Sequence, residues 1–325
     1  MAIMTRPSPD GMHPPQCLGE SPELQATLRA ARLVAAAEVS VLIQGESGTG
    51  KELLARSIHA WSRRAAGPLV PVNCAALPEG LAESALFGHR RGAFTGATAD
   101  HEGHVCAAEG GTLLLDEVAE LPLALQPKLL RFLESGECQP VGASRPRRAD
   151  VRVIAASHRD LWAEVEAGRL RRDLYYRLNV VPLELPPLRR RSGDVPLLLD
   201  AFTARLAARH GLEPPRLLPA ARRRLEAYHW PGNVRELRNL CERLVVLFPG
   251  RQVDVPNLPR EIREEGAGAG ATGFELPEGG LRMDELEAAL IRQALDKTGG
   301  NRSRAARLLG LSRDTLLYRI RKYAI

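Results

Sequence analysis

The sequence predicts an α/β fold, a mainly parallel sheet with helices on both faces, followed by helical regions. Two observations predict this fold. Between residues 39 and 185, short apolar runs alternate with helical stretches, as expected when a helix joins each strand to a parallel neighbour. From about residue 194 to 248 the pattern is wholly helical with no candidate strand, and a last helical unit follows from about residue 281.

The predicted elements follow one another in order. A helix begins at Ser21-Pro22-Glu23, where a Ser cap precedes Pro at the first helical position and an acid in the first turn, and it ends near Ala37. Residues 39–44 form a predicted buried strand, which leads through a Gly-rich turn into a helix over residues 51–62. Further strands are predicted at residues 69–72, 112–116, 151–157 and 179–185, and helices around residues 78–86, 122–134 and 160–176.

The composition is that of an ordinary globular protein. Hydrophobic residues make up 44% of the 325 residues, but aromatic residues only 4%, so the core must consist mainly of Leu, Val, Ile and Ala. No apolar run approaches the roughly 18 residues of a membrane helix, and Pro and polar residues interrupt the N-terminus, unlike a signal peptide. The cysteines stand singly without a C-x-x-C pair, which argues against a disulfide framework or zinc site and favours a cytoplasmic location.

The positive charge is concentrated at the C-terminus. Residues 301–325 contain seven Arg or Lys against one acid, Asp314, so this segment carries the same net charge as the whole chain, +6. A basic tail on a neutral body predicts contact with a polyanion, with a solvated helix as the alternative.

The pattern inside this tail is typical of a helix-turn-helix. An amphipathic helix over residues 283–297 ends at Gly299-Gly300, and two shorter helices follow, capped by Asn301 and Ser312. The expected core residues are Ala305, Ala306, Leu309, Leu316 and Ile320. The side chains expected to contact DNA bases and phosphates are Arg302, Arg304, Ser312, Arg313, Thr315, Tyr318, Arg319 and Lys322.

A phosphate-binding motif stands near the start of the sheet. Gly45-Glu46-Ser47-Gly48-Thr49-Gly50-Lys51 matches G-x-x-x-x-G-K, directly after a predicted strand and opening a predicted helix. Its glycines let backbone N–H groups curl around phosphates, the helix N-terminus adds positive potential, and Lys51 neutralises the outer phosphates. Glu52 departs from the general motif, which has Ser or Thr there to hold Mg²⁺. Alone, the motif leaves open a simple Gly turn before a helix.

A second motif completes the predicted nucleotide site. TLLLDE (112–117) is an apolar strand that ends in two carboxylates. Asp116 is placed to hold Mg²⁺ through water, and Glu117 to polarise the attacking water. An acidic loop after a strand is the alternative, but the two halves together predict binding and hydrolysis of ATP.

Four motifs carry a resemblance to a known family: GESGTGKE (45–52), GAFTGA (92–97), GGTLLLDE (110–117) and WPGNVREL (230–237). They resemble the AAA+ domain of bacterial enhancer-binding proteins, ATPases that activate transcription by sigma-54 RNA polymerase. The similarity runs from about residue 17 to 250, and the tail resembles the family's Fis-type DNA-binding domain, which binds as a dimer. Because the family also has Glu after the motif lysine, Glu52 does not argue against nucleotide binding.

The resemblance implies a division of the chain and a set of functional residues. The divisions are a short N-terminal segment (1–16), an α/β ATPase subdomain (17–188), a helical lid (189–250), a flexible linker (251–280) and a Fis-type helix-turn-helix (281–325). The linker includes the Gly- and Ala-rich stretch EEGAGAGATG (264–273). Asn73 matches a residue that contacts the catalytic Glu, and His158 and Arg235 match the first and second nucleotide sensors. Arg171 and Arg177 match arginines that reach the neighbouring subunit's nucleotide, so hydrolysis would require a ring, a hexamer of this chain or a mixed ring with a homologue.

The resemblance also implies a moving loop. Gly92, Ala93, Phe94, Thr95, Gly96 and Ala97 would contact the sigma factor, with Phe94 and Thr95 at the tip. Around this loop the chain departs from the family, because Ala85, Arg90 and Cys106 stand where three Glu residues are usual. Either the coupling of the loop to the nucleotide site is weakened, or Arg90 and Arg91 make different pairs.

The sequence therefore predicts a ring-forming ATPase that binds upstream DNA and remodels sigma-54 polymerase. The few residues before the ATPase suggest regulation by a separate partner, through the level of expression, or by a piece that this sequence lacks. Two alternatives stay open: a DNA-binding repressor or scaffold with a vestigial ATPase core, and an AAA+ remodeller with another client.

Overall fold

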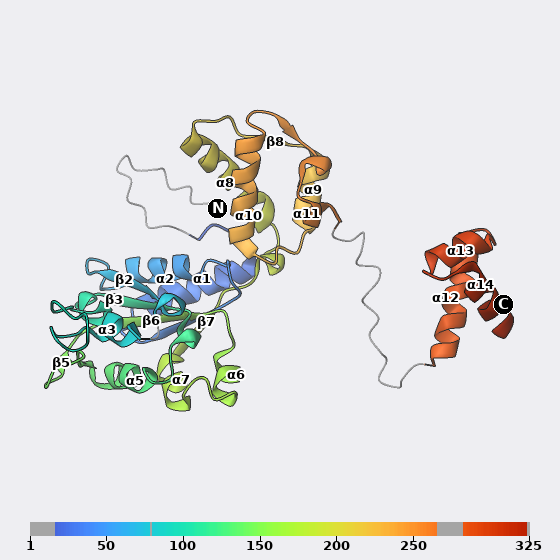
Figure 1. Cartoon of the computed structure of the whole chain (residues 1–325). Helices are drawn as coiled ribbons and strands as arrows, with labels where there is room; N and C mark the ends of the chain where they lie inside the picture. The colour runs from blue at the N-terminus through green and yellow to red at the C-terminus, as the bar shows by residue number, and fades with distance from the viewer. Residues whose placement is uncertain (1–16, 79, 265–281, 324–325) are drawn as a thin grey trace. The chain divides into compact units, whose positions relative to one another are not determined.

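The computed structural model describes residues 17–78, 80–264 and 282–323 and divides the chain into two compact units, residues 1–263 and 264–325 (Figure 1). Across those described stretches, none of the helices combines the length and apolar character needed to cross a membrane.

The core of the first unit is a five-stranded parallel sheet in the order β2-β3-β6-β1-β7. Its strands are β1 (Val41–Gln44), β2 (Leu69–Asn73), β3 (Thr112–Asp116), β6 (Arg152–Ser157) and β7 (Val181–Glu184). The flanking helices are α1 (Pro22–Ala35), α2 (Lys51–Ala60), α3 (Ala82–Phe87), α4 (His104–Ala107), α5 (Gln126–Ser135), α6 (Leu161–Glu166) and α7 (Arg172–Leu178). Single turns η1 (Cys74–Ala76) and η2 (Val118–Glu120) and the hairpin strands β4 (Glu137–Cys138) and β5 (Arg147–Arg148) complete this part.

Alternate residues of each buried strand face opposite layers. Ile43, Leu114 and Ile154 pack with α1 and α2 on one face, whereas Leu42 and Leu113 pack on the other with the layer that contains α5 and α7 (Figure 1). This period of two, with both faces apolar, is what a buried parallel sheet requires. The predicted parallel sheet with helices on both faces is confirmed.

Two local predictions are wrong. The helix over residues 160–176 is split into α6 and α7, because Gly168 takes a left-handed conformation (φ +72°) that ends the first helix. Ser21 does not cap α1 through its side chain, because its hydroxyl donates instead to Asp194 Oδ2 (3.0 Å).

The helical lid follows the sheet. It contains η3 (Leu188–Arg190), α8 (Asp194–His210), α9 (Pro219–Ala227), α10 (Asn233–Leu247), η4 (Val255–Asn257) and α11 (Arg260–Glu264), with strands β8 (Arg216–Leu217) and β9 (Gln252–Val253) paired in parallel. Buried Val253, Leu258 and Ile262 join the core formed by α8 and α10. The lid therefore extends to residue 264, and two predictions need correction: residues 251–264 are not linker, and the region 194–248 does contain a short strand.

The second unit is a three-helix domain made of α12 (Met283–Lys297), α13 (Arg302–Leu308) and α14 (Arg313–Lys322). Ala305, Ala306, Leu316 and Ile320 are buried with Ile291 and Ala294, and Leu309 packs against them, as predicted. The predicted caps are also present, since Asn301 accepts from the N–H of Arg304 and Ser312 from that of Thr315, both at 3.1 Å. The rest of the predicted linker, residues 265–281, lies outside the described residues.

Candidate functional site

The phosphate-binding motif lies at the carboxyl edge of the sheet. Residues 45–50 connect the end of β1 to the start of α2, and β1 pairs with β6, which pairs with β3. The carboxyl ends of these parallel strands bring the motif, Asp116-Glu117 and His158 to one place. Gly48 (φ +78°) lies so close to the lid that a Cβ atom there would be 2.3 Å from the carbonyl oxygen of Gly232, so only glycine fits.

Lys51 begins α2 and its side chain folds back over the motif. Its Nζ donates to the carbonyl oxygens of Gly45 (2.9 Å) and Glu46 (3.3 Å) and lies 3.8 Å from Oε1 of Glu117. Burial lowers the pKa of Lys51, and the charges of Glu117 and Asp116 oppose this shift. A cation at the opening of a loop of backbone N–H groups suits a polyphosphate.

Glu117 is held at the end of β3 by His158. Glu117 has a left-handed backbone (φ +54°), which is uncommon outside glycine and is found at functional sites. Its Oε2 accepts the backbone N–H of His158 at 3.2 Å and lies 2.5 Å from Nδ1 of the same residue. Burial acts to raise the pKa of Glu117, but the hydrogen bond from His158 and the charge of Lys51 outweigh it and leave the pKa below its ordinary value. The carboxylate is therefore both oriented and ionised.

Asp116 carries the second carboxylate of this edge. Burial and the charge of Glu117 raise the pKa of Asp116, and the charge of Lys51 opposes this shift. Carboxylate oxygens are the ligands that Mg²⁺ prefers, so these residues fit that cation. The described parts of the chain contain no cluster of three or more His, Cys, Asp or Glu suited to a metal, so water and phosphate would have to supply the remaining ligands.

Asn73 is close to this edge but does not make the expected contact. It ends β2 in register with Asp116 on β3. Its Oδ1 accepts the backbone N–H of Ala75 (3.0 Å), and no contact within the described ranges joins it to Glu117. In this structure His158, not Asn73, holds the carboxylate of Glu117.

Two hollows open between the sheet and the lid. The first, of about 260 Å³, is lined by Lys51, Asp116, Glu117 and, from α10, Arg235, Arg238 and Asn239. Arg235 reaches the motif directly, because its Nη1 donates to Oγ of Ser47 (3.0 Å). The second, of about 120 Å³, shares Gly50, Leu53 and Val234 with the first, and its other lining residues include Cys17, Leu18, Arg191, Leu198 and Phe202. A charged hollow joined to a more apolar one has the chemistry to hold a phosphate chain and a flat base. Glu52 lines the first hollow and pairs with Arg56 (2.7 Å).

Residues 92–97 form the tip of an irregular loop. Its base is closed by His89 and His101, whose backbones exchange two hydrogen bonds of 2.9 Å. The ring of Phe94 packs on that of His89 with 4.9 Å between centroids, and Thr95 is exposed. Ala97 is only 7% exposed, so in this conformation the sequence expectation that it contacts a partner does not fit its position.

Arginine contacts are found at two of the three positions around this loop where Glu is usual, Arg90 and Cys106. Arg90 pairs with Asp100 (2.5 Å), whose other oxygen accepts the backbone N–H of Arg91 (2.7 Å). Nε of Arg147 lies 2.6 Å from Sγ of Cys106, and Arg147 also pairs with Glu102. The loop base is therefore held by a different set of pairs, to which Arg90 contributes its side chain and Arg91 its backbone.

The C-terminal domain presents α13 and α14 with several exposed polar side chains. Arg302, Arg304 and Arg313 are exposed, and Tyr318 is 68% exposed. Thr315 bonds the cap residue Ser312, and Lys322 lies over the ring of Tyr323. Arg319 differs from the sequence expectation, because it is half-buried and paired with Glu287 of α12.

Comparison with known proteins places these features in one family. Three family models match in succession: a sigma-54 interaction domain (residues 17–184), an AAA+ ATPase lid domain (189–273) and a bacterial regulatory protein of the Fis family (282–323). The chain is 49% identical over 303 residues to the transcriptional regulatory protein ZraR of Escherichia coli K12, covering 93% of this chain and 68% of ZraR. It is 45% identical over 312 residues to the regulatory protein AtoC of the same organism, covering 95% of this chain and 68% of AtoC.

The chain belongs to the sigma-54-dependent transcriptional activators. Among solved structures it is similar to NtrX from Brucella abortus in complex with ATP, with 34% identity and a TM-score of 0.71, covering 95% of this chain and 69% of NtrX. The predicted family, the AAA+ fold with its lid and Fis-type domain, and ATP as the nucleotide are confirmed. The protein is therefore an AAA+ ATPase that works with sigma-54 polymerase and DNA.

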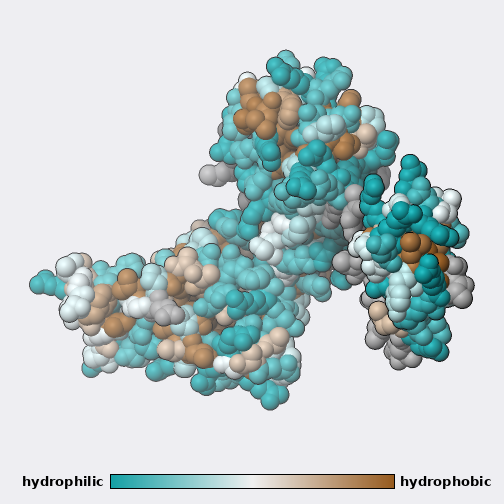
Figure 2. Space-filling model, turned by 45° about the vertical axis from the view of Figure 1, so that its right-hand side comes forward, coloured by the Kyte–Doolittle hydropathy of each residue, from teal (hydrophilic) through white to brown (hydrophobic). Residues whose placement is uncertain are grey.

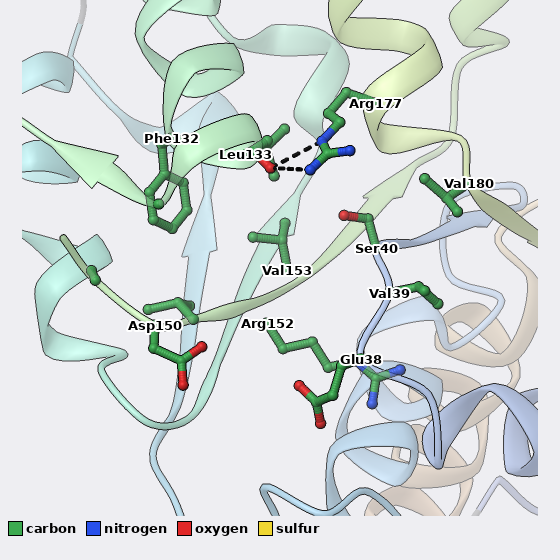
Figure 3. Close-up of a pocket in the computed structure, with 13 residues that line it drawn as sticks. Glu38, Val39, Ser40, Phe132, Leu133, Asp150, Arg152, Val153, Arg177 and Val180 are labelled. Atoms are coloured by element: carbon green, nitrogen blue, oxygen red, sulfur yellow. Dashed lines mark hydrogen bonds between the residues drawn. The ribbon is translucent and has the colours of Figure 1, made fainter.

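Two arginines of this activator lie away from the phosphate-binding motif and the first hollow. Arg177 is in α7, which leads into the amino end of β7, whereas the phosphate motif follows the carboxyl end of β1. Figure 3 shows Arg177 donating through Nε and Nη2 to the carbonyl oxygen of Leu133 (2.9 and 2.7 Å), in a pocket that Glu38, Ser40 and Arg152 also line. Arg171 pairs with Asp173 (2.7 Å). Neither arginine lines the first hollow.

Sequence reasoning missed the residues through which the lid holds the phosphate motif. Glu46 pairs with Arg189 of η3 (2.5 Å), and Asn233 and Arg191 donate to the backbone of the motif. Asn233 stands in WPGNVREL, but only Arg235 of that motif was singled out as a functional residue.

Proposed function

We propose that this activator binds MgATP in the two hollows between sheet and lid and hydrolyses it at a site completed by a neighbouring copy in a ring. The observation that carries this proposal is the placement of ionised Glu117 beside Lys51 at the carboxyl edge of the sheet. The backbone of residues 45–52 and Lys51 would hold the phosphates, and Arg235 would sense them from the lid. Asp116 would hold Mg²⁺ through water, and the magnesium would neutralise phosphate charge.

Glu117 is the proposed base for the attacking water. Its carboxylate is ionised and is oriented by two hydrogen bonds from His158, so it can accept a proton from water without first moving. Asn73, in register with Asp116, would contact Glu117 in another nucleotide state and relay that state.

Arg171 and Arg177 are the proposed contribution of the neighbouring copy. A cation supplied in trans stabilises the charge on the transferring phosphoryl group. Because Arg177 lies at the amino edge of the sheet, it would serve the site of the next copy in the ring, a hexamer or a mixed ring with a homologue.

The tip of the loop, Phe94 and Thr95, is the proposed contact with the sigma factor. Hydrolysis would retract this loop and move sigma-54, so that promoter DNA melts. The glycines at 92 and 96 allow the loop to change conformation, since both have positive φ and open space around their Cα atoms.

The C-terminal domain is proposed to bind upstream DNA as a dimer. Its groove of about 640 Å³ is lined by Met283, Leu286, Leu290, Leu309 and Leu311, and Figure 2 shows apolar surface on this otherwise polar domain. A second copy of the domain would cover this groove, and a separate protein would supply regulation. The activator would act in the cytoplasm, where polymerase and chromosome meet.

The test of this function is Glu117→Gln, which keeps the shape of the side chain and removes its basicity. We expect ATP binding close to that of the unaltered protein and turnover at least about a hundredfold lower, the usual size of a general-base effect. A Glu109→Gln variant, changed at an exposed carboxyl away from the hollow, is the control. Unchanged turnover in Glu117→Gln would remove this residue from the chemistry.

A second candidate is a DNA-binding repressor or scaffold whose ATPase no longer drives remodelling. The absence of the usual acids at Ala85, Arg90 and Cys106 favours it. The two candidates differ in one result: the repressor would bind DNA but open no promoter in the presence of ATP.

A further inference from the structure

The backbone carbonyl groups of residues 45–49 in the phosphate motif all accept hydrogen bonds. Those of Gly45 and Glu46 accept from Lys51, and that of Glu46 also accepts from Oγ1 of Thr49 (2.8 Å). The next three are bonded by the lid: Ser47 by Nδ2 of Asn233 (3.0 Å), Gly48 by the backbone N–H of Arg235 (3.2 Å) and Thr49 by Nη2 of Arg191 (3.0 Å). The carbonyl and the N–H of one peptide group point in opposite directions, so each carbonyl bonded by the lid directs the following N–H away from the lid residue that bonds it, the side proposed to receive phosphate.

Asn233 is the centre of this contact. It is fully buried and has a left-handed backbone (φ +52°), a conformation that Asn tolerates better than most residues. Besides Ser47, its Nδ2 donates to Oε2 of Glu46 (3.2 Å), and its Oδ1 accepts the backbone N–H of Leu188 (2.8 Å). One amide thus joins the phosphate motif to both the beginning of the lid and the start of α10.

Charge reinforces the contact that Asn233 makes. Arg189 donates two hydrogen bonds to the carboxylate of Glu46 (2.8 and 2.5 Å). The hydrogen bonds from Arg189 and Asn233 lower the pKa of Glu46 to about 2, so this carboxylate stays ionised and keeps accepting from Asn233 at physiological pH.

Asn233 lines neither of the two hollows in which nucleotide is proposed to lie, although its neighbour Val234 lines both. Its side chain therefore acts on nucleotide indirectly, through the groups that it bonds: the carbonyl of Ser47, the carboxylate of Glu46 and the backbone N–H of Leu188. Asn233 differs in this respect from Arg235, whose side chain lines the first hollow.

We infer that Asn233 is a positioning residue that sets the affinity for ATP from the lid, by fixing the carbonyl of Ser47 and so the N–H groups that receive the phosphates. The inference rests on the proposed function of the motif as the ATP site. The position of the lid and the binding of ATP to the motif are then coupled. When the lid is held in place the motif binds ATP more tightly, and bound ATP in turn stabilises that position of the lid.

The test is Asn233→Gly in the full-length protein, because glycine keeps the left-handed backbone without strain while it removes the side chain that carries the amide. We expect the Kd for ADP and the KM for ATP to rise about tenfold or more, the size of the loss of one buried hydrogen-bonding group, with kcat changed less than about threefold. Asn233→Asp, which turns the donor into an acceptor facing Glu46, should weaken binding further.

The matched control is Asn257→Gly, also in the lid. Asn257 bonds the backbone N–H of Asp254 (2.9 Å), so this change weakens the lid without touching the motif. If Asn257→Gly lowers the thermal midpoint as much as Asn233→Gly but leaves the Kd for ADP unchanged, general destabilisation is excluded. An unchanged Kd in Asn233→Gly overturns the inference.

Lys51→Ala separates this inference from the proposed function. If Lys51→Ala loses ADP binding while Asn233→Gly retains it, the motif is the ATP site and only the role of Asn233 is wrong. If Lys51→Ala binds ADP normally, the proposed site itself is wrong.

Discussion

Glu117 and His158 meet across neighbouring strands, with Oε2 of Glu117 2.5 Å from Nδ1 of His158 and 3.2 Å from its backbone nitrogen. The meeting follows from topology, because β3 and β6 are adjacent and parallel and each residue follows the end of its strand. Two hydrogen bonds to one oxygen stabilise the ionised carboxylate and offset part of the cost of its left-handed backbone.

The pH dependence of turnover should reflect this contact. A carboxyl whose pKa is held below its ordinary value of about 4.3 stays ionised above that pH and loses its charge only as the pH falls through the lowered value. We therefore expect no acid limb from Glu117 in kcat between about pH 6 and 8. His158→Ala should raise the pKa of Glu117 toward its ordinary value and lower kcat through lost orientation. An acid limb with its midpoint near neutrality that vanishes in Glu117→Gln would contradict this account.

The trans role of Arg177 predicts complementation between two inactive variants. Lys51→Ala lacks nucleotide binding and Arg177→Ala lacks the trans cation, so each alone should have turnover reduced about a thousandfold. When the two variants are mixed, some interfaces in a ring bring the intact Lys51 of an Arg177→Ala subunit next to the intact Arg177 of a Lys51→Ala subunit. Part of the ATPase activity should therefore return. Arg172→Ala is the control, because Arg172 stacks on Trp162 and Tyr176 beside these residues. No recovery on mixing, with mixed rings shown to form, would place Arg177 outside the neighbour's site.

DNA binding should reside in the C-terminal domain. Removing residues 281–325 should weaken binding to the upstream site at least about a hundredfold and abolish its steep salt dependence. Within the domain, Arg313→Ala should cost about 1–3 kcal/mol of binding free energy, and Arg319→Ala less, because Arg319 is paired with Glu287. Fluorescence anisotropy at several salt concentrations measures the DNA affinity of the truncated protein and of the two variants. Equal affinity of the truncated protein would refute the assignment.

The pair Arg90–Asp100, at the base of the loop, should help to couple ATP hydrolysis to promoter opening. Because both side chains are exposed, solvent screens their charges and the pair adds little to stability, so single charge reversals should leave the fold intact. We expect Arg90→Asp and Asp100→Arg each to lower the number of promoters opened per ATP hydrolysed, and the double reversal to recover part of the loss. Equal yields in all four proteins would show that the pair plays no part in coupling.

The sequence predicted the sheet, the phosphate motif and the helix-turn-helix well, because each depends on local patterns. Apolar runs mark β1, β3 and β6, and glycine spacing marks residues 45–51. It failed where structure depends on distant partners. Val253 reads as loop, yet it belongs to a strand that pairs with residues 216–217 far back in the chain.

The same reasoning explains what was missed at the site. Asn233 donates to Ser47 across 186 residues, and no spacing rule connects the two. Arg319 was expected to face DNA because helix periodicity places it on the outer face of α14, but Glu287 on α12 lies against it. The side chain of Asn73 bonds the nearby backbone N–H of Ala75, and no contact with Glu117 is found among the residues that the structure describes.

The most direct test of the central claim is ATP-dependent promoter opening by sigma-54 polymerase, with ATP turnover recorded in the same reactions. On a supercoiled promoter carrying the upstream site, the unaltered protein should form open complexes while it hydrolyses ATP. Thr95→Ala, changed at the exposed tip of the loop, should hydrolyse ATP at a similar rate and open few promoters. Hydrolysis without opening by the unaltered protein, or normal opening by Thr95→Ala, would contradict the account.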